Sequence, residues 1–245
     1  MSQTIIITGA SSGIGAATAK VFLNAGWQVG LIARRQDVLE KVAAGHANAH
    51  ILVADVTDET ALRVAFERFA KAAGRLDVLF NNAGMVGPSG LIDEIPLDQW
   101  RATVELNLTG MFLAARFAFG QMRAQSPQGG RIINNGSVSA QSPRPATVAY
   151  CSTKHAITGL TKSLSLDGRA FDIACGQIDI GNAQTELLQQ LNAKTLAANP
   201  AADMPEMMDV AIAADAVLQM ASLPSEANVQ FMTVMATKMP LVGRG

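Results

Sequence analysis

Short, uninterrupted apolar runs alternate along the chain with longer segments in which apolar residues recur at helical spacing. Uninterrupted runs of this length are typical of parallel strands whose two faces are both covered by helices. The pattern therefore predicts strands separated by helices, the first helix over residues 13–25. The predicted strands span residues 4–8, 28–33, 50–54, 76–80, 131–135, 172–178 and 229–235.

The alternation of strand and helix with short connections predicts the fold class. We expect an α/β protein with a single domain over residues 1–245, built as a Rossmann-type, doubly wound parallel sheet of about seven strands with helices on both faces. Thr57 is expected to cap the helix after the third strand, and a new helix is expected to begin near Thr147. Ligands of such sheets bind at the carboxyl ends of the strands, so the residues after each strand are the candidate site.

Composition narrows the class of protein. The chain has 245 residues and a net charge of −1, which gives no indication of a nucleic-acid or membrane-surface partner. Cys151 and Cys175 form no disulfide framework and have no metal-site spacing, so we expect a reduced, cytoplasmic setting and no metal. The first apolar run is too short for a signal peptide or a membrane span. We expect a soluble protein with a small-molecule partner.

The segment "TGASSGIG", residues 8–15, directly follows the first strand and leads into a helix. Glycine allows a tight turn and a close approach of ligand, and a helix N-terminus offers N–H groups to a pyrophosphate. The spacing differs from the common G-x-G-x-x-G fingerprint, and an ordinary glycine-rich turn is the alternative. The predicted cofactor contacts here are Gly9, Ser11, Ser12, Gly13, Ile14 and Gly15.

The end of the second strand carries bases rather than an acid. Arg34 and Arg35 follow Ala33, and Asp37 is expected at the start of the next helix. An acid here would bind the ribose 2′-hydroxyl of NAD, whereas arginine suits the 2′-phosphate of NADP. A solvated arginine pair is the alternative. The pattern favours NADP(H) over NAD(H).

Small and polar residues follow the next two strands. Asp55 is expected to bond an adenine amino group, with Val56 beside it. In "NNAG", Asn82, Ala83 and Gly84 would let backbone lie close to a flat ring or a ribose. Such residues are common turn formers, so their shared position at strand ends is what makes them candidates.

Asn107 lies on an otherwise apolar helical stripe. A buried amide is costly unless it is hydrogen-bonded. It is either a core asparagine bonded by backbone or water, or an asparagine that holds a water near the active site. The stripe comprises Trp100, Val104, Met111, Ala114 and Ala118.

The segment after the fifth strand carries the candidate catalytic residues. Ser137 follows the strand, and Tyr150, the single tyrosine of the chain, precedes Lys154 by one helical turn. A nearby ammonium favours the phenolate, so we expect the pKa of Tyr150 to lie well below its ordinary value of about 10. Such a phenol can act as a catalytic acid, and Ser137 can polarise a substrate oxygen. The alternatives are a solvated helix face and a turn serine.

These motifs together resemble the short-chain dehydrogenase/reductase family, in its compact single-domain branch, with 3-oxoacyl-carrier-protein reductases among the more similar members. The resemblance implies that Tyr150 is the general acid/base and that Lys154 binds the nicotinamide ribose and lowers the pKa of Tyr150. It implies that Ser137 orients the carbonyl and that Asn107, in "ELNLTG", holds a proton-relay water. It also implies a base for NADP at Arg34, and a homotetramer or dimer.

Two segments depart from the family pattern. After the sixth strand the family usually has a Pro-Gly pair and, four residues past the glycine, a threonine. In "CGQIDIGNAQTE", Cys175 stands in place of the proline and Ile180 stands at the threonine spacing. Either Thr185 substitutes through a longer loop, or the carboxamide contact is backbone only, at Ile178. The C-terminus lacks the usual glycine pair, and a substrate lid is expected over residues 181–206.

The combined interpretation is an NADP(H)-dependent oxidoreductase that interconverts a carbonyl and a secondary alcohol by hydride transfer. One alternative is an NAD(H)-dependent alcohol, polyol or sugar dehydrogenase of the same family. The other is a catalytically silent nucleotide-binding scaffold, which only the altered loop supports. The fold is shared by enzymes of many substrates, so acyl thioesters, sugars, polyols and steroid-type alcohols all stay open.

Overall fold

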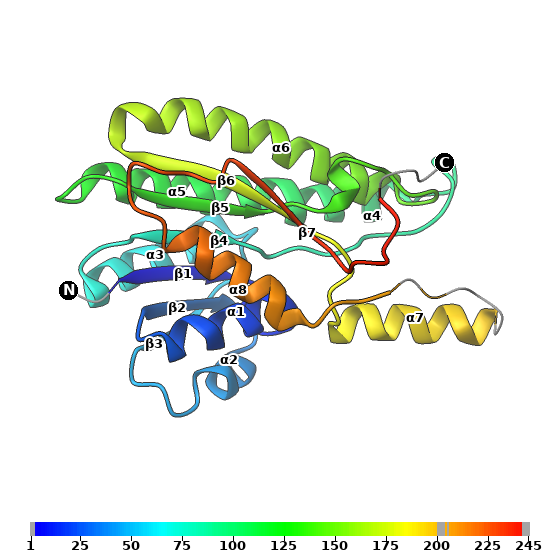
Figure 1. Cartoon of the computed structure of the whole chain (residues 1–245), viewed down its shortest axis with the longest axis horizontal. Helices are drawn as coiled ribbons and strands as arrows, with labels where there is room; N and C mark the ends of the chain where they lie inside the picture. Colours follow the sequence, from blue (N-terminus) through cyan, green and yellow to red (C-terminus); the bar gives the residue numbers. More distant parts are fainter. Residues whose placement is uncertain (1–2, 200–203, 205, 242–245) are drawn as a thin grey trace.

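The computed structural model describes residues 3–199, 204 and 206–241 and contains one parallel sheet of seven strands. The strand order is β3-β2-β1-β4-β5-β6-β7, so the chain reverses direction across the sheet between β1 and β4 (Figure 1). Such a switch point is where a doubly wound sheet binds ligands. The strands are β1 (Thr4–Thr8), β2 (Gln28–Ala33), β3 (Ala49–Val53), β4 (Val78–Asn81), β5 (Gly130–Asn135), β6 (Ile173–Ile180) and β7 (Phe231–Val234).

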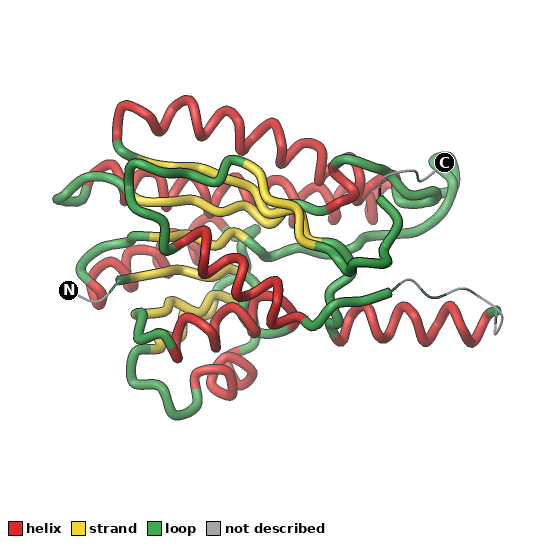
Figure 2. Tube along the Cα trace, viewed as in Figure 1, coloured by secondary structure: helices red, strands yellow, loops and turns green. Residues whose placement is uncertain are grey.

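Helices cover both faces of this sheet, as Figure 2 shows in red against the yellow strands. The predicted fold class is therefore confirmed. The α-helices are α1 (Gly13–Asn24), α2 (Gln36–Ala43), α3 (Glu59–Ala73), α4 (Leu97–Val104), α5 (Gly110–Ala124), α6 (Val148–Gly168), α7 (Glu186–Ala198) and α8 (Val210–Ala221). Shorter turns are the π-helix η1 (Glu105–Thr109) and the 3-10 helices η2 (Val138–Ala140) and η3 (Arg169–Phe171).

The uninterrupted apolar runs are explained by two separate cores. Ile5 and Ile7 of β1 pack with the helices α1, α2 and α8, whereas Ile6 packs with α3 and α5 on the opposite face. Successive side chains of a strand point to opposite faces, so a strand that is covered on both faces must be apolar at every position. This arrangement leaves the carboxyl ends of the strands as the place for polar chemistry.

Several predicted boundaries differ from the structure by one or two residues, and two of the differences have a clear physical reason. The strand β6 runs to Ile180, two residues beyond the predicted end, because Asp179 and Ile180 pair with Thr233 and Val234 of β7. Thr57 does not cap α3, because Asp58 is the N-cap and its carboxylate accepts hydrogen bonds from the backbone N–H groups of the first turn. A carboxylate can accept from two such groups at once, which makes Asp58 the stronger cap.

The π-helix η1 interrupts the apolar stripe that contains Asn107. Met111, Ala114 and Ala118 are buried as the stripe predicts, but Trp100 and Val104 are only half-buried. A π-turn inserts an extra residue into the helical repeat and rotates the face that points inward. Asn107 nevertheless stays fully buried, with 0% of its surface exposed.

Helix α7 occupies part of the predicted lid region and extends beyond the edge where the strands end (Figure 1). Residues 200–203 and 205 of that region lie outside the described residues. Across the part of the chain that the structure describes, none of the helices combines the length and the apolar character needed to cross a membrane.

Candidate active site

The glycine turn after β1 is packed too closely for side chains. Gly9 and Gly13 have φ values of 69° and 53°, which L-residues rarely adopt. A Cβ at Gly9 would lie 2.9 Å from the Cα of Ala83, and a Cβ at Gly15 would collide with the Gly9 carbonyl. Gly15 therefore lets the start of α1 lie directly on the turn. Helix N-termini provide N–H donors and partial positive charge, so the turn forms an anion site.

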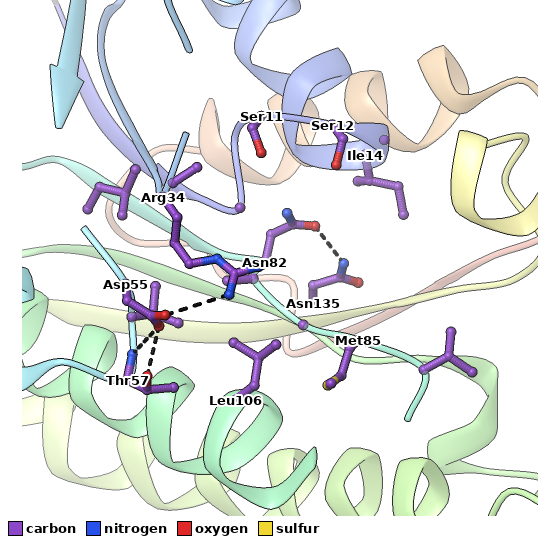
Figure 3. Close-up of a pocket in the computed structure, with 18 of the residues that line it drawn as sticks. Ser11, Ser12, Ile14, Arg34, Asp55, Thr57, Asn82, Met85, Leu106 and Asn135 are labelled. Carbon is purple, nitrogen blue, oxygen red and sulfur yellow. Dashed lines mark hydrogen bonds and ion pairs between the residues drawn. The ribbon is translucent and has the colours of Figure 1, made fainter. Parts of the chain in front are cut away.

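A cavity of about 790 Å³ lies along the carboxyl ends of the strands and begins at this turn (Figure 3). It lies at the switch point, and its size is in the range of ligand pockets. The predicted residues Gly15, Asn107, Ser137 and Ile178 do not line it. The predicted residues that do line it are Gly9, Ser11, Ser12, Gly13, Ile14, Arg34, Arg35, Asp55, Val56, Asn82, Ala83, Gly84, Tyr150 and Lys154.

Arg34 reaches over the cavity from the end of β2 toward Asp55 (Figure 3). Its Nη1 lies 3.8 Å from the Asp55 Oδ2, and its side chain is 78% exposed, so the ion pair is weak. The Asp55 Oδ1 accepts hydrogen bonds from the Thr57 N–H and hydroxyl at 3.0 and 2.8 Å. These bonds fix the carboxylate and leave the Arg34 guanidinium adaptable. Asp37 lies in the first turn of α2, as expected.

The floor of the cavity ties three strand ends together. The Asn82 amide Nδ2 donates to the Thr8 carbonyl at 2.9 Å, and the Asn82 backbone N–H donates to the Thr8 hydroxyl at 2.8 Å. The Asn82 Oδ1 accepts from the Asn135 Nδ2 at 2.8 Å. Asn135 lines the cavity but was not among the predicted residues, although it too stands at the end of a strand.

The buried amide of Asn107 is saturated by the loop that follows β4. Its Oδ1 accepts from the Met85 N–H and its Nδ2 donates to the Met85 carbonyl, both at 2.8 Å. The Nδ2 also lies 3.3 Å from the Thr153 hydroxyl. Of the two interpretations, the core asparagine bonded by backbone describes this side chain. The water-holding role stays a prediction, and Asn107 does not line the cavity.

Tyr150 and Lys154 line the other end of the cavity, and Ser137 lies beside Tyr150 without lining the cavity itself. Tyr150 and Lys154 lie one turn apart in α6, with the Lys154 Nζ 5.6 Å from the centre of the Tyr150 ring. This Nζ donates to the Asn135 carbonyl at 2.7 Å, and Lys154 is only 4% exposed. Ser137, which caps η2, forms a side-chain hydrogen bond to Tyr150.

The proton affinities of this group differ from the expectation. Burial raises the pKa of Tyr150 above its ordinary value, while the hydrogen bond to Ser137 and the charge of Arg144 act in the opposite direction. The expectation of a depressed pKa is therefore wrong for this structure, because the loss of solvation outweighs the favourable neighbours. Burial also lowers the pKa of Lys154 to about 8, an effect that the charge of Asp179 opposes.

The loop after β6 contains the glycine and the threonine of the family pattern at the usual spacing. Because β6 extends to Ile180, Gly181 is the first residue past the strand, and Thr185 lies four residues further on. Thr185 lines the cavity, and its Cγ2 would lie 3.2 Å from a Cβ at Gly13. Only the proline is replaced, by Ile180. Thr185 thus occupies the threonine position without a longer loop.

The predicted contact at Ile178 is wrong for the same reason. Ile178 lies inside the sheet with 0% of its surface exposed, and its carbonyl accepts from the Gly136 N–H at 2.8 Å. Its side chain packs in the core on the α1 face. The strand end lies two residues further along the chain.

One functional candidate was missed altogether. Asp179 is only 2% exposed and lies directly behind the Ser137 turn. An acid is rarely buried unless it is paired or hydrogen-bonded. A lone acid within the apolar run "QIDIG" is the sequence signal that could have identified it.

The fold and the cavity define an α/β protein with a ligand site at the switch point of its sheet and a serine, a tyrosine and a lysine gathered at one end. Residues 3–196 match the family model for short chain dehydrogenases. The chain belongs to the short-chain dehydrogenase family, whose members are oxidoreductases of alcohols and carbonyls.

Individual relatives agree with this assignment. The chain is 34% identical over 231 residues to 2-(R)-hydroxypropyl-CoM dehydrogenase of Xanthobacter autotrophicus. The aligned residues make up 90% of this chain and 92% of that protein. It is 32% identical over 213 residues to 3beta-hydroxysteroid dehydrogenase of Mediterraneibacter gnavus, covering 84% of this chain and 76% of that one. The structure of 3-ketoacyl-(acyl-carrier-protein) reductase from Brucella melitensis, complexed with NADH, superposes with a TM-score of 0.85 at 24% identity over 96% of each chain.

Proposed function

We propose that this protein is an NADP(H)-dependent oxidoreductase that interconverts a carbonyl and a secondary alcohol, with Tyr150 as general acid/base. The observation that carries the proposal is the continuity of the cavity. It joins the glycine turn and Arg34 at one end to Tyr150 and Lys154 at the other. Hydride transfer is the chemistry that a nicotinamide supplies when bound.

The residues of the cavity fit a dinucleotide phosphate. The glycine turn and the N-terminus of α1 would hold the pyrophosphate, since a Cβ at Gly9 would fill the space against Ala83. Arg34 would hold the 2′-phosphate through its exposed guanidinium. Asp55 would accept the adenine amino group, and Asn82, Ala83 and Gly84 would line the path to the nicotinamide end.

The chemical roles follow from the proton inventory of the site. At neutral pH the Tyr150 phenol keeps its proton, because its pKa is raised, and it can donate that proton to the oxygen of a carbonyl substrate. The Ser137 hydroxyl can donate a hydrogen bond to the same oxygen and polarise it. The ammonium of Lys154 would hold a ribose hydroxyl and favour the phenolate that remains after proton transfer.

The preference for NADP(H) has a direct test in Arg34. We expect Arg34→Ala to weaken NADPH binding far more than NADH binding, as measured by titration of the cofactor's fluorescence. Arg35→Ala is the matched control, since Arg35 is adjacent and also lines the cavity. Equal losses for both cofactors would refute a 2′-phosphate role for Arg34.

An NAD(H)-dependent enzyme is the second candidate. The specific observation in its favour is Asp55, whose carboxylate lies 3.8 Å from Arg34 and can draw the guanidinium away from a 2′-phosphate. The Brucella melitensis reductase also carries NADH. A lower dissociation constant for NADH than for NADPH in the unmodified protein would establish this alternative.

A catalytically silent scaffold has lost its structural argument, because the only support for it was the altered loop. A spectrophotometric screen of ketones, 3-oxoacyl thioesters, sugars and steroid-type alcohols with NADPH and NADH tests turnover. Oxidation of NADPH by any of these carbonyls supports the proposal. Tight cofactor binding without turnover across the whole panel would support the scaffold.

We further propose a cytoplasmic setting and a homotetramer or dimer. The cytoplasmic setting is supported by Cys151 and Cys175, which are both free and buried. The oligomer is supported by the family resemblance and by apolar side chains that α4 and α5 leave exposed, such as Leu97 and Phe112. Cell fractionation and light scattering on the purified protein measure these two properties.

A further inference from the structure

Asp179 is a buried acid to which the proposed mechanism gives no part. Its Oδ1 accepts from the Ser137 N–H at 3.0 Å and from the Gln177 Nε2 at 2.7 Å. Its Oδ2 accepts from the Gln141 Nε2 at 2.6 Å. All three donors are neutral, so the carboxylate is hydrogen-bonded on both oxygens without an adjacent counter-charge among these contacts. Such a group is an unusual choice for a structural contact alone, since burying a charge is costly.

The backbone next to Ser137 is shaped around this carboxylate. A Cβ at Gly136 would collide with the Asp179 Oδ1 and would lie 2.7 Å from the Gln177 Nε2. Gly136 does not have a positive φ, so it is not required by the backbone conformation. The absence of its side chain is explained by the space that the carboxylate fills. Gly136 and Asp179 are therefore complementary to each other.

A chain of buried polar side chains holds the carboxylate in place. It runs from β4 through β5 and α6 to β6. Each side chain in it is hydrogen-bonded to a side chain of the next of these elements. The links are Asn81 Nδ2 to Asn134 Oδ1 at 3.2 Å, Asn134 Nδ2 to Thr161 Oγ1 at 3.0 Å, and Thr161 Oγ1 to Gln177 Oε1 at 3.2 Å. Fully satisfied networks of this kind are rigid. The negative charge is thus held at a defined position.

The negative charge of Asp179 affects the protonation of both Tyr150 and Lys154. Burial favours the neutral form of Tyr150 most, Ser137 and Arg144 favour its ionised form, and Cys151 and Asp179 favour the neutral form. Burial lowers the pKa of Lys154, and the charge of Asp179 opposes that effect by favouring the ammonium. One carboxylate therefore acts on both members of the pair.

We propose that Asp179 is a positioning residue of the active site: its carboxylate fixes the Ser137 turn and supplies a buried negative charge that keeps Lys154 charged and Tyr150 protonated. This inference rests on the proposed function only for its catalytic meaning. The effect on the two side chains is a property of the folded protein and can be measured without substrate or cofactor.

The direction of the effect is the same for both groups. A nearby negative charge disfavours loss of a proton, so its removal lowers the pKa of Tyr150 and the pKa of Lys154. In Asp179→Asn, the phenolate should therefore form at a lower pH than in the unmodified protein. If the enzyme oxidises alcohols, the limb of its pH profile that requires the phenolate should move to lower pH by a similar amount.

The single tyrosine makes the test specific. Tyrosine carrying the heavy carbon isotope at Cζ gives one ring signal in this chain, and its chemical shift reports the protonation of Tyr150 alone. We would titrate the unmodified protein and Asp179→Asn, and follow far-ultraviolet circular dichroism at each pH to confirm that the fold persists. A lower midpoint in the folded variant supports the proposal. An unchanged midpoint in a folded variant would overturn it.

Two further variants separate a charge effect from a loss of stability. Asp77→Asn is the matched control, because Asp77 also accepts from a buried neighbour, the Thr4 N–H at 2.9 Å, but lies at the opposite end of the strands. Its loss should leave the Tyr150 midpoint unmoved. Should Asp179→Asn not fold, Asp179→Ser removes the charge with a smaller side chain, and the same two outcomes decide.

The complementarity to Gly136 gives an independent measurement. Gly136→Ala should lower the melting temperature strongly in the unmodified protein and much less in the Asp179→Ser background, where the colliding carboxylate is gone. Additive losses would contradict the shaping of this turn around Asp179. Because the Tyr150 titration and the melting temperatures do not involve turnover, they can succeed or fail independently of the proposed reaction.

Discussion

Gly15 is the position where the glycine turn leaves the least room for a side chain. In Gly15→Ala the new Cβ would collide with the Gly9 carbonyl oxygen and would lie 2.7 Å from the Asn82 Nδ2. Asn82 cannot yield freely, since this Nδ2 donates to the Thr8 carbonyl at 2.9 Å and its Oδ1 accepts from Asn135. The start of α1 must therefore move away from the turn.

The magnitude follows from the cost of overpacking. Inserting a methyl group into a packed site typically costs about 1–3 kcal/mol. If that cost falls on the geometry that binds the pyrophosphate, the dissociation constant of NADPH rises by about 5-fold to 150-fold. If it falls on folding, the melting temperature decreases by about 2–10 °C. The two measurements together should account for the loss.

Gly120→Ala is the matched control for this change. Gly120 also lies in a helix, α5, but a Cβ added there meets no atom within 4 Å. The control should bind NADPH normally and gain slightly in stability, because alanine is the better helix former. If Gly15→Ala matched the control in both affinity and melting temperature, the proposed packing of α1 on the turn would be refuted.

The remaining predictions concern the protonation of Lys154 and the N-cap of α3. Burial lowers the pKa of Lys154 from 10.5 to about 8, so between these values the unfolded chain binds more protons, and stability should rise with pH across that window. Lys154→Met should reduce this rise in thermal melts, and an identical pH dependence in both proteins would contradict the depressed pKa. Asp58→Ala should lower the free energy of unfolding by about 1 kcal/mol, whereas Thr57→Val should leave the cap of α3 intact. Chemical denaturation measures both losses, and a larger loss in Thr57→Val than in Asp58→Ala would show that Thr57 is the cap.

The parts of the fold that the sequence predicts well are those set by local pattern. The bounds predicted for β1 and β2 agree with the structure, because each apolar run begins at a polar residue, Thr4 or Gln28, and is followed by a glycine or an arginine. The glycine turn, Arg34 and Asp55 follow from the rule that ligands lie past the strand ends. The same rule would have included Asn135, had every strand end been treated alike.

The parts that the sequence does not predict depend on contacts between distant segments. The end of β6 is set by its pairing with β7, some fifty residues further along the chain, as in Ile180 with Val234. A strand end placed two residues too early shifts the expected loop pattern, so the sequence alone predicts a contact at Ile178 and does not fix the position of Thr185. The pKa of Tyr150 likewise depends on burial, which no spacing of tyrosine and lysine along one helix reveals.

The central claim is that Tyr150 exchanges the proton of the reaction. The most direct measurement is the turnover of Tyr150→Phe with the best substrate from the carbonyl screen, beside its affinity for NADPH. The account predicts that turnover is abolished while NADPH binding and the melting temperature stay close to those of the unmodified protein. Full activity in Tyr150→Phe would contradict the account, because no other tyrosine in the chain could replace the lost hydroxyl.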